Sequence, residues 1–221
     1  MSEIDKHAPP TKLLWVDLEM TGLDVNKDVI IEIAAEVTDF NFKTLASYEA
    51  LIKQSDRKLK HMNPWAQAQH DKSGLTERVR TQGKPEKDVI HELVGFIKAQ
   101  FGDEPAVLAG NSIHNDRNFI KQWWPQVDAV LHYRMMDVSS LKMIMQVKYG
   151  VEFEKKETHR AFDDIQGFDC RTAVLLGMVR REEIAKREQF YPGEFGVYFG
   201  YNPKEYPWLM QRLNEKHLNG T

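Results

Sequence analysis

Four acidic residues lie inside or beside apolar runs in three separate parts of the chain, and this pattern limits how the chain can fold. Asp17 and Glu19 lie in LLWVDLEMTGL, Asp116 lies in GNSIHNDRNF, and Asp164 lies in THRAFDDIQ. A carboxylate in apolar surroundings is costly unless a hydrogen bond or an opposite charge compensates it. We therefore expect the fold to gather these carboxylates around something cationic, and a divalent metal ion is the simplest candidate.

The length and composition fit one soluble domain, or one domain with an appendage. The chain has 221 residues, of which 42% are hydrophobic and 29% are charged. No uninterrupted apolar stretch reaches the roughly 20 residues that a membrane-spanning helix needs. The formal net charge of −3 argues against a groove for a long polyanion, but it allows a small phosphorylated substrate. We predict a cytoplasmic protein without a membrane partner.

We expect three parts along the chain. Residues 1–11 form a flexible leader, residues 12–188 form the main domain, and residues 189–221 form an arm rich in aromatic residues, glycine and proline. The arm either packs on the domain or meets a partner. The only cysteine, Cys170, is expected to be a small buried residue in a helix. As the alternative, a nucleophile, it would need a histidine and an oxyanion site around it.

The order of the expected elements predicts an α/β domain with a mixed sheet. Five strands are expected, over residues 12–20, 29–38, 45–52, 106–109 and 132–138, and the first three form a meander. Helices are expected from Pro64, over 85–100, from Ser112 to about Trp124, over 139–148 and over 158–187. Because strands come first and then alternate with helices, the sheet should contain parallel and antiparallel pairs.

Asp17 and Glu19 are two residues apart on an expected strand, so both side chains point to the same face. The other face is lined by Leu14, Val16, Leu18 and Met20. Two like charges roughly 7 Å apart on a buried strand repel each other. The only nearby cation in sequence is Lys12. The alternative interpretation is a pair of solvent-facing acids on an edge strand.

The position of Asp116 follows from helical periodicity. Phe119, Ile120 and Trp123 follow it at the i+3, i+4 and i+7 positions, so Asp116 shares the core-facing stripe of the expected helix. An aspartate near a helix start is otherwise a cap or a partner of the helix dipole. Its place in the apolar stripe favours a metal ligand.

The late helix offers two acidic candidates, Asp163 and Asp164. At about 100° per residue, Asp164 adjoins the apolar stripe one turn before Phe168, whereas Asp163 points away from it. We therefore expect Asp164 to be the ligand and Asp163 to face solvent. If Thr158 caps this helix, His159 leans over the site from the first turn. The alternative is a solvent-facing histidine.

Four carboxylates and one histidine suit two divalent ions held about 4 Å apart. Oxygen ligands select Mg²⁺ or Mn²⁺ rather than zinc. A neutral imidazole takes a proton from water, and a bound ion lowers the pKa of that water. The set therefore predicts in-line hydrolysis of a phosphodiester.

Five blocks of sequence, in order, resemble one nuclease family. They are WVDLEMTGL, SGLTERV, GNSIHNDRNF, HYRMMDVSSLK and THRAFDDI. The spacing of the acidic residues and the histidine resembles the DEDDh 3′–5′ exonucleases, and the blocks together resemble the oligoribonuclease group. The resemblance runs from about Leu13 to Arg180. It implies a ribonuclease H-like fold, a mixed five-stranded sheet flanked by helices, with residues 12–188 as the exonuclease domain.

The resemblance also implies a function. Such a protein is a homodimer that degrades very short RNA, especially dinucleotides, to nucleoside 5′-monophosphates with two divalent cations, Mg²⁺ or Mn²⁺. The metal ligands would be Asp17, Glu19, Asp116 and Asp164, and His159 would be the base. The competing interpretations are an exonuclease for longer RNA or DNA, and an inactive scaffold on the same fold.

Further site residues are implied by the same resemblance. Leu23 and Trp65 would flank the two bases, and Ser112, Arg134 and Ser139 would bind the terminal 5′ phosphate. Tyr133, as a catalytic residue, and His70, as a substrate-binding residue, would reach across the dimer into the partner's site. From the residues alone, the alternatives are that Trp65 is a core residue and that Tyr133 and Arg134 are ordinary strand residues.

Overall fold

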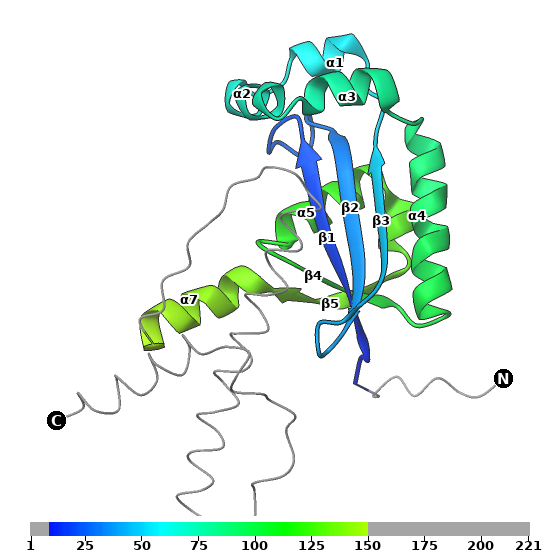
Figure 1. Cartoon of the computed structure of the whole chain (residues 1–221), viewed down its shortest axis with the longest axis vertical. Coiled ribbons are helices and arrows are strands. Elements are labelled where there is room, and N and C mark those ends of the chain that lie inside the picture. Colours follow the sequence, from blue (N-terminus) through cyan, green and yellow to red (C-terminus); the bar gives the residue numbers. More distant parts are fainter. Residues whose placement is uncertain (1–8, 150–221) are drawn as a thin grey trace, which may run out of the picture. The chain divides into compact units, whose positions relative to one another are not determined.

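A computed structural model of the chain describes residues 9–149, and this part contains one mixed sheet of five strands. The strands are β1 (Lys12–Met20), β2 (Ile30–Asp39), β3 (Thr44–Leu51), β4 (Ala106–Gly110) and β5 (Leu131–Asp137). They lie in the order β3-β2-β1-β4-β5 (Figure 1). The first three are antiparallel neighbours, whereas β4 and β5 run parallel to β1. The predicted meander and the mixed five-stranded sheet are confirmed.

Seven helices accompany the sheet within the described range. They are α1 (Asp56–Lys60), α2 (Pro64–Lys72), α3 (Leu75–Gln82), α4 (Glu86–Phe101), α5 (His114–Trp123), α6 (Pro125–Asp128) and α7 (Val138–Tyr149). Helices α4 and α5 pack on one face of the sheet. Val89, Leu93 and Ile97 of α4 are buried in the same core as Phe119 and Ile120 of α5.

The side chains of β1 alternate between two faces of the sheet, as the sequence predicts. Leu14, Val16 and Leu18 belong to the core beneath α4 and α5. Asp17 and Glu19 therefore point to the opposite face. Strand β1 lies in the middle of the sheet between β2 and β4, so the alternative of two acids on an edge strand is excluded.

The turn that follows β1 is held by the carboxylate of Asp28. It accepts hydrogen bonds from Thr21 Oγ1 and from the backbone N–H of Asp24, each at 2.9 Å. A Cβ atom on Gly22 would collide with this carboxylate, so a side chain at that position would displace Asp28 from these hydrogen bonds. The turn presents Leu23 to solvent with 78% of its surface exposed.

Helices α1, α2 and α3 are grouped beyond the end of β1 to which its arrow points (Figure 1). The side chain of Asn63 caps α2 by accepting a hydrogen bond from the backbone N–H of Trp65 at 3.0 Å, and Pro64 is the first helical residue, as predicted. The backbone N–H of Asn63 donates to the carbonyl of Thr21 at 2.7 Å. This hydrogen bond fixes the start of α2 against the turn after β1.

The expected element boundaries agree with the structure to within two residues, but three helices were not predicted. Helices α1 and α6 have only five and four residues, which is too short to give a hydrophobic period. Gly74, with a φ of 72°, separates α2 from the unpredicted α3. The expected helix over 158–187, most of the leader and the arm at 189–221 lie outside the described residues. None of the helices among residues 9–149 is long and apolar enough to span a bilayer.

Candidate active site

Asp17 and Glu19 lie near the end of β1, beyond its pairing with β4. Strand β4 is paired with β1 as far as Trp15 and Ala109, and it ends at Gly110. Both acidic side chains are half-buried. On the side where β4 has ended, the backbone groups of the last part of β1 can therefore form hydrogen bonds with another segment.

Asp116 reaches this edge from the first turn of α5. Its Oδ1 accepts a hydrogen bond from the backbone N–H of Leu18 at 3.0 Å. Because Leu18 stands between Asp17 and Glu19, the third acidic residue is brought beside the first two. The predicted burial of Asp116 in the apolar stripe is confirmed, since both Asp116 and Ile120 are buried on α5.

The loop between β4 and α5 allows this close approach. A Cβ atom on Gly110 would lie 2.9 Å from the carbonyl oxygen of Val16, so a side chain there would push β4 away from β1. Ser112 has a φ of 54°, a left-handed conformation that is uncommon for residues other than glycine. The sharp turn lets α5 begin at His114 and place its first turn over the end of β1.

Burial raises the pKa of Asp116 from 3.8 to about 7. The negative charge of Asp137 acts in the same direction, whereas the hydrogen bond from Leu18 lowers the pKa because it stabilises the anion. An ionised carboxylate is therefore costly at this position without a cation nearby. This chemistry fits a ligand of a divalent metal ion.

The described part of the site is not a closed metal cage. Among residues 9–149, no group of three or more histidine, cysteine, aspartate or glutamate side chains is arranged to hold a metal ion by itself. Asp17 and Glu19 flank Leu18, whose backbone N–H is hydrogen-bonded to Asp116, and carboxylate oxygens are ligands for divalent cations. The remaining predicted members, Asp164 and His159, lie outside the described residues.

His70 lies on α2 beside the end of β1. Its side chain is 3% exposed, and its Nε2 donates to the carbonyl of Met20 at 2.9 Å. The same nitrogen lies 3.9 Å from Glu19 Oε2. The ring thus packs against β1 of its own chain and borders the acidic site. Its role toward a second subunit stays a prediction.

Glu32 adds another carboxylate beside Glu19, because the two residues are cross-strand partners on β2 and β1. Glu32 is buried, and its Oε1 lies 3.3 Å from a guanidinium nitrogen of Arg78. A buried carboxylate needs such a partner. Arg78 comes from the SGLTERV block, which thus compensates a charge next to the candidate metal ligands.

Leu23 and Trp65 form an exposed apolar surface near this end of β1. Leu23 is 78% exposed and Trp65 is 65% exposed. The hydrogen bond between Asn63 and Thr21 joins the backbone two residues before each of them. The turn after β1 and the start of α2 therefore present both side chains from adjoining backbone, and Trp65 is not a core residue.

Ser112 and Ser139 are brought together, with their Oγ atoms 3.0 Å apart. The backbone N–H of Ser112 donates to Ser139 Oγ at 2.9 Å and to Asp137 Oδ1 at 3.0 Å. Ser139 Oγ in turn donates to Asn111 Oδ1 at 3.0 Å, and Lys142 Nζ donates to the same oxygen at 2.8 Å. The two serines thus belong to a polar cluster at the ends of β4 and β5.

Tyr133 and Arg134 are both exposed on β5, the strand that leads to Asp137. The guanidinium carbon of Arg134 lies 5.3 Å from the centre of the Tyr133 ring. The same ring stacks on that of His132 at 4.5 Å. Their exposure leaves both side chains accessible to a ligand or to a second subunit.

Three residues of this polar cluster were not predicted from the sequence: Asp137, Asn111 and Lys142. A signal for Asp137 exists, because an aspartate directly before a helix is a typical N-cap. The contact between Lys142 and Asn111 joins positions that are 31 residues apart, and no local pattern predicts it.

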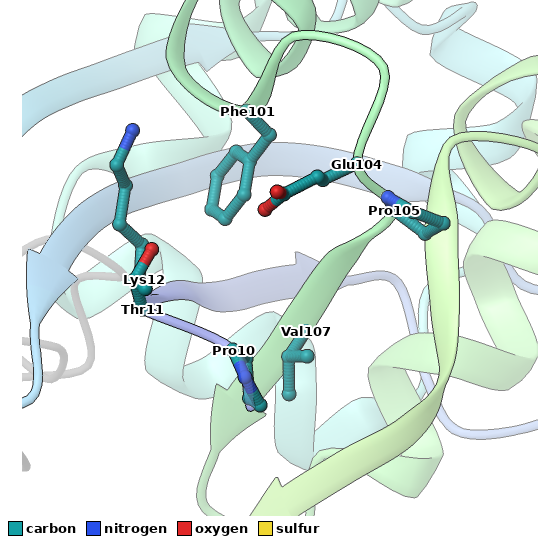
Figure 2. A pocket seen from close by; sticks show the side chains of 7 residues that line it. All are labelled: Pro10, Thr11, Lys12, Phe101, Glu104, Pro105 and Val107. Atoms are coloured by element: carbon teal, nitrogen blue, oxygen red, sulfur yellow. The ribbon is translucent and has the colours of Figure 1, made fainter. Parts of the chain in front are cut away.

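A small pocket lies at the other end of β1 (Figure 2). Its lining residues are Pro10, Thr11, Lys12, Phe101, Glu104, Pro105 and Val107. Lys12 begins β1, whereas Asp17 and Glu19 lie near its end. The pocket is therefore not part of the candidate site.

Comparison with known proteins identifies a matching family and similar proteins. Residues 14–167 match the model of the exonuclease family RNase_T. An oligoribonuclease from Francisella tularensis subsp. novicida is 43% identical over 156 residues, covering 70% of this chain and 88% of that protein. The mitochondrial oligoribonuclease of Bos taurus is 42% identical over 159 residues, covering 70% of this chain and 67% of that protein.

Solved structures support the fold. Exonuclease I from Methylocaldum szegediense matches with a TM-score of 0.61 at 17% identity, over 89% of this chain and 50% of that chain. Exonuclease I of E. coli, in complex with a dT13 oligonucleotide, matches with a TM-score of 0.61 at 14% identity, over 75% of this chain and 41% of that chain. The chain thus spans half or less of these exonucleases, and at such identities the likeness shows the fold alone. From the family match and the close relatives together, the chain belongs to the exonuclease family, in its oligoribonuclease group, and has a ribonuclease H-like fold.

Proposed function

We propose that this chain is a metal-dependent 3′–5′ exoribonuclease that hydrolyses very short RNA, above all dinucleotides, to nucleoside 5′-monophosphates. The observation that carries the proposal is the hydrogen bond from the backbone N–H of Leu18 to Asp116, which joins a buried carboxylate to the residue that stands between Asp17 and Glu19. The names of the 42–43% identical relatives support an oligoribonucleotide substrate.

Asp17, Glu19, Asp116 and Asp164 would hold two divalent cations, Mg²⁺ or Mn²⁺. When bound, such ions lower the pKa of water and stabilise the attacking and leaving oxygens of an in-line displacement. Asp116 supports this role because its burial makes an ionised carboxylate costly without a cation. His159 would take the proton from the attacking water in its neutral form.

The substrate would lie between the exposed apolar side chains and the serine pair. Leu23 and Trp65 would flank the bases, and stacking on an aromatic ring contributes about 1–3 kcal/mol per base. Ser112 and Ser139 would bind the 5′ phosphate, with Arg134 as a bidentate cation. A closed site at the 5′ end would exclude longer chains sterically. His70 would bind substrate across the dimer, in the partner's site.

A homodimer is part of the proposal, with Tyr133 of each subunit acting in the partner's site. The 74% exposure of Tyr133 on β5 supports this role. A cytoplasmic location is proposed as well. The single cysteine of the chain supports it, because proteins of reducing compartments do not depend on disulfides.

Hydrolysis of labelled RNA of two, five and about twenty nucleotides tests the substrate class. We expect the dinucleotide to have the highest kcat/KM. Its binding should depend only weakly on salt, because each phosphate that the protein neutralises adds about 0.7 to the slope of log affinity against log salt concentration. Equal or faster turnover of the longest RNA, or of single-stranded DNA of that length, would replace the proposal with a general exonuclease.

A further inference from the structure

One carboxylate oxygen holds the two serines that are proposed to bind the 5′ phosphate. Asp137 Oδ1 accepts hydrogen bonds from the backbone N–H of Ser112 at 3.0 Å and from that of Ser139 at 2.9 Å. Ser112 lies in the loop after β4, and Ser139 lies in the first turn of α7. Asp137 therefore joins two segments that contribute to the same site.

These hydrogen bonds also explain the conformation of Ser112. Its φ of 54° is one that serine rarely adopts. The backbone N–H that results from this turn points at Asp137 Oδ1 and at Ser139 Oγ together. Without the carboxylate oxygen, the Ser112 backbone would lose a partner that holds it in this conformation, and the two hydroxyls would no longer be kept 3.0 Å apart.

Asp137 is unsuited to bind a phosphate itself, because two negative charges repel each other. Its Oδ2 instead lies 3.4 Å from His114 Nδ1. Lys142 brings a positive charge to the same cluster through Asn111 Oδ1. Any effect of Asp137 on substrate must therefore act through the serines that it holds.

We propose that Asp137 is a positioning residue of the 5′-phosphate subsite, which fixes Ser112 and Ser139 side by side and thereby sets the preference for a 5′-phosphorylated substrate. The inference rests on the proposed function, in which these serines bind that phosphate. It adds the residue that aligns the serine hydroxyls.

The test compares two dinucleotides, one with a 5′ phosphate and one with a 5′ hydroxyl, on the full-length metal-loaded protein. The measured quantity is the ratio of their kcat/KM values. Asp137→Ala and Asp137→Asn both remove the charge, but only asparagine keeps an oxygen acceptor at this position. We expect the ratio to fall about fivefold or more in Asp137→Ala, mainly through KM, and to stay within about twofold of wild type in Asp137→Asn.

Asp39 provides a matched control. Its Oδ1 also accepts two backbone N–H hydrogen bonds, from Asn41 at 2.8 Å and from Lys43 at 3.0 Å. It lies opposite Lys12, at the start of β1 and away from the acidic site. Asp39→Ala should lower stability by a similar mechanism but leave the substrate ratio unchanged.

The outcomes separate the inference from the proposed function. A wild-type ratio near one would remove the 5′-phosphate subsite, and the inference with it. A clear wild-type preference that persists in a folded Asp137→Ala would overturn the inference alone, because an equal loss on both substrates shows a purely structural role. If Asp137→Ala does not fold, Asp137→Glu keeps the charge but displaces the oxygen, and an unchanged ratio in that variant would equally contradict the proposal.

Discussion

The carboxylate of Asp116 and the backbone N–H of Leu18 are joined by a 3.0 Å hydrogen bond that spans 98 positions of the chain. The bond satisfies a backbone group on β1 where β4 has ended, and it places a third carboxylate beside Asp17 and Glu19. The same contact thus stabilises the fold and positions a candidate metal ligand. Substitutions of Asp116 can separate its effect on stability from its effect on activity.

Asp116→Asn should abolish hydrolysis and leave the fold intact. The amide oxygen can still accept from Leu18, but the neutral group is a poor ligand for a divalent cation. We expect kcat/KM to fall at least about 100-fold. Asp116→Ala should also lose about 1–3 kcal/mol of stability, because the Leu18 N–H is left without its acceptor. Substantial activity in a folded Asp116→Asn would exclude Asp116 as a metal ligand.

The stability of the metal-free protein should fall as the pH rises. In the folded state the pKa of Asp116 is raised to about 7, whereas an unfolded aspartate titrates near 3.8. Between these values the folded state keeps a proton that the unfolded state has lost, so stability decreases from about pH 4 to about pH 7 and then levels off.

Urea denaturation in chelator tests this dependence, with Asp116→Asn as the control. We expect the variant to become more stable relative to wild type as the pH rises from about 5 to 7. Adding Mg²⁺ at higher pH should stabilise the wild type more than the variant, because only the folded wild type presents the charged ligand. A constant difference between the two proteins across this pH range would show that burial of Asp116 does not control its ionisation.

Trp65→Ala should weaken substrate binding without loss of stability. The side chain is 65% exposed, so its removal opens no cavity in the core. Loss of one stacked base should raise KM by about 5- to 100-fold. Phe40→Ala removes another exposed aromatic side chain, at the end of β2, and should leave KM unchanged. Equal KM values for the Trp65 and Phe40 variants would rule out a base-stacking role.

Asp164→Ala should abolish turnover, whereas Asp163→Ala should keep a large share of it. Both residues lie outside the described range, and the prediction rests on the helical phase that turns Asp164 toward the apolar stripe. Initial rates on a dinucleotide at saturating Mg²⁺ distinguish the two. Comparable losses in both variants would show that the assumed helical phase is wrong.

The sheet and the long helices could be predicted from sequence because their signals are local. Alternation placed Asp17 and Glu19 on one face of β1, and the period of α5 placed Asp116 in a buried stripe. Pro64 marked the start of α2. Each of these features depends on residues that are close in sequence, within two turns of a helix or within one strand.

The remaining features depend on contacts between distant segments. The contact between the His70 ring and the carbonyl of Met20 joins positions that are 50 residues apart. The cluster of Ser112, Ser139 and Asp137 forms only when β4 and β5 lie side by side. No periodicity in a single sequence specifies such pairs, because their geometry is set by the packing of the sheet.

Nucleotide release from a 5′-phosphorylated dinucleotide, before and after removal of divalent ions, tests the central claim most directly. We predict that chelator stops release, that Mg²⁺ or Mn²⁺ restores it in the wild type, and that neither ion restores it in Asp17→Asn. Continued release by the fully chelated wild type would contradict the account, since Asp17, Glu19 and Asp116 would then have no cation to hold.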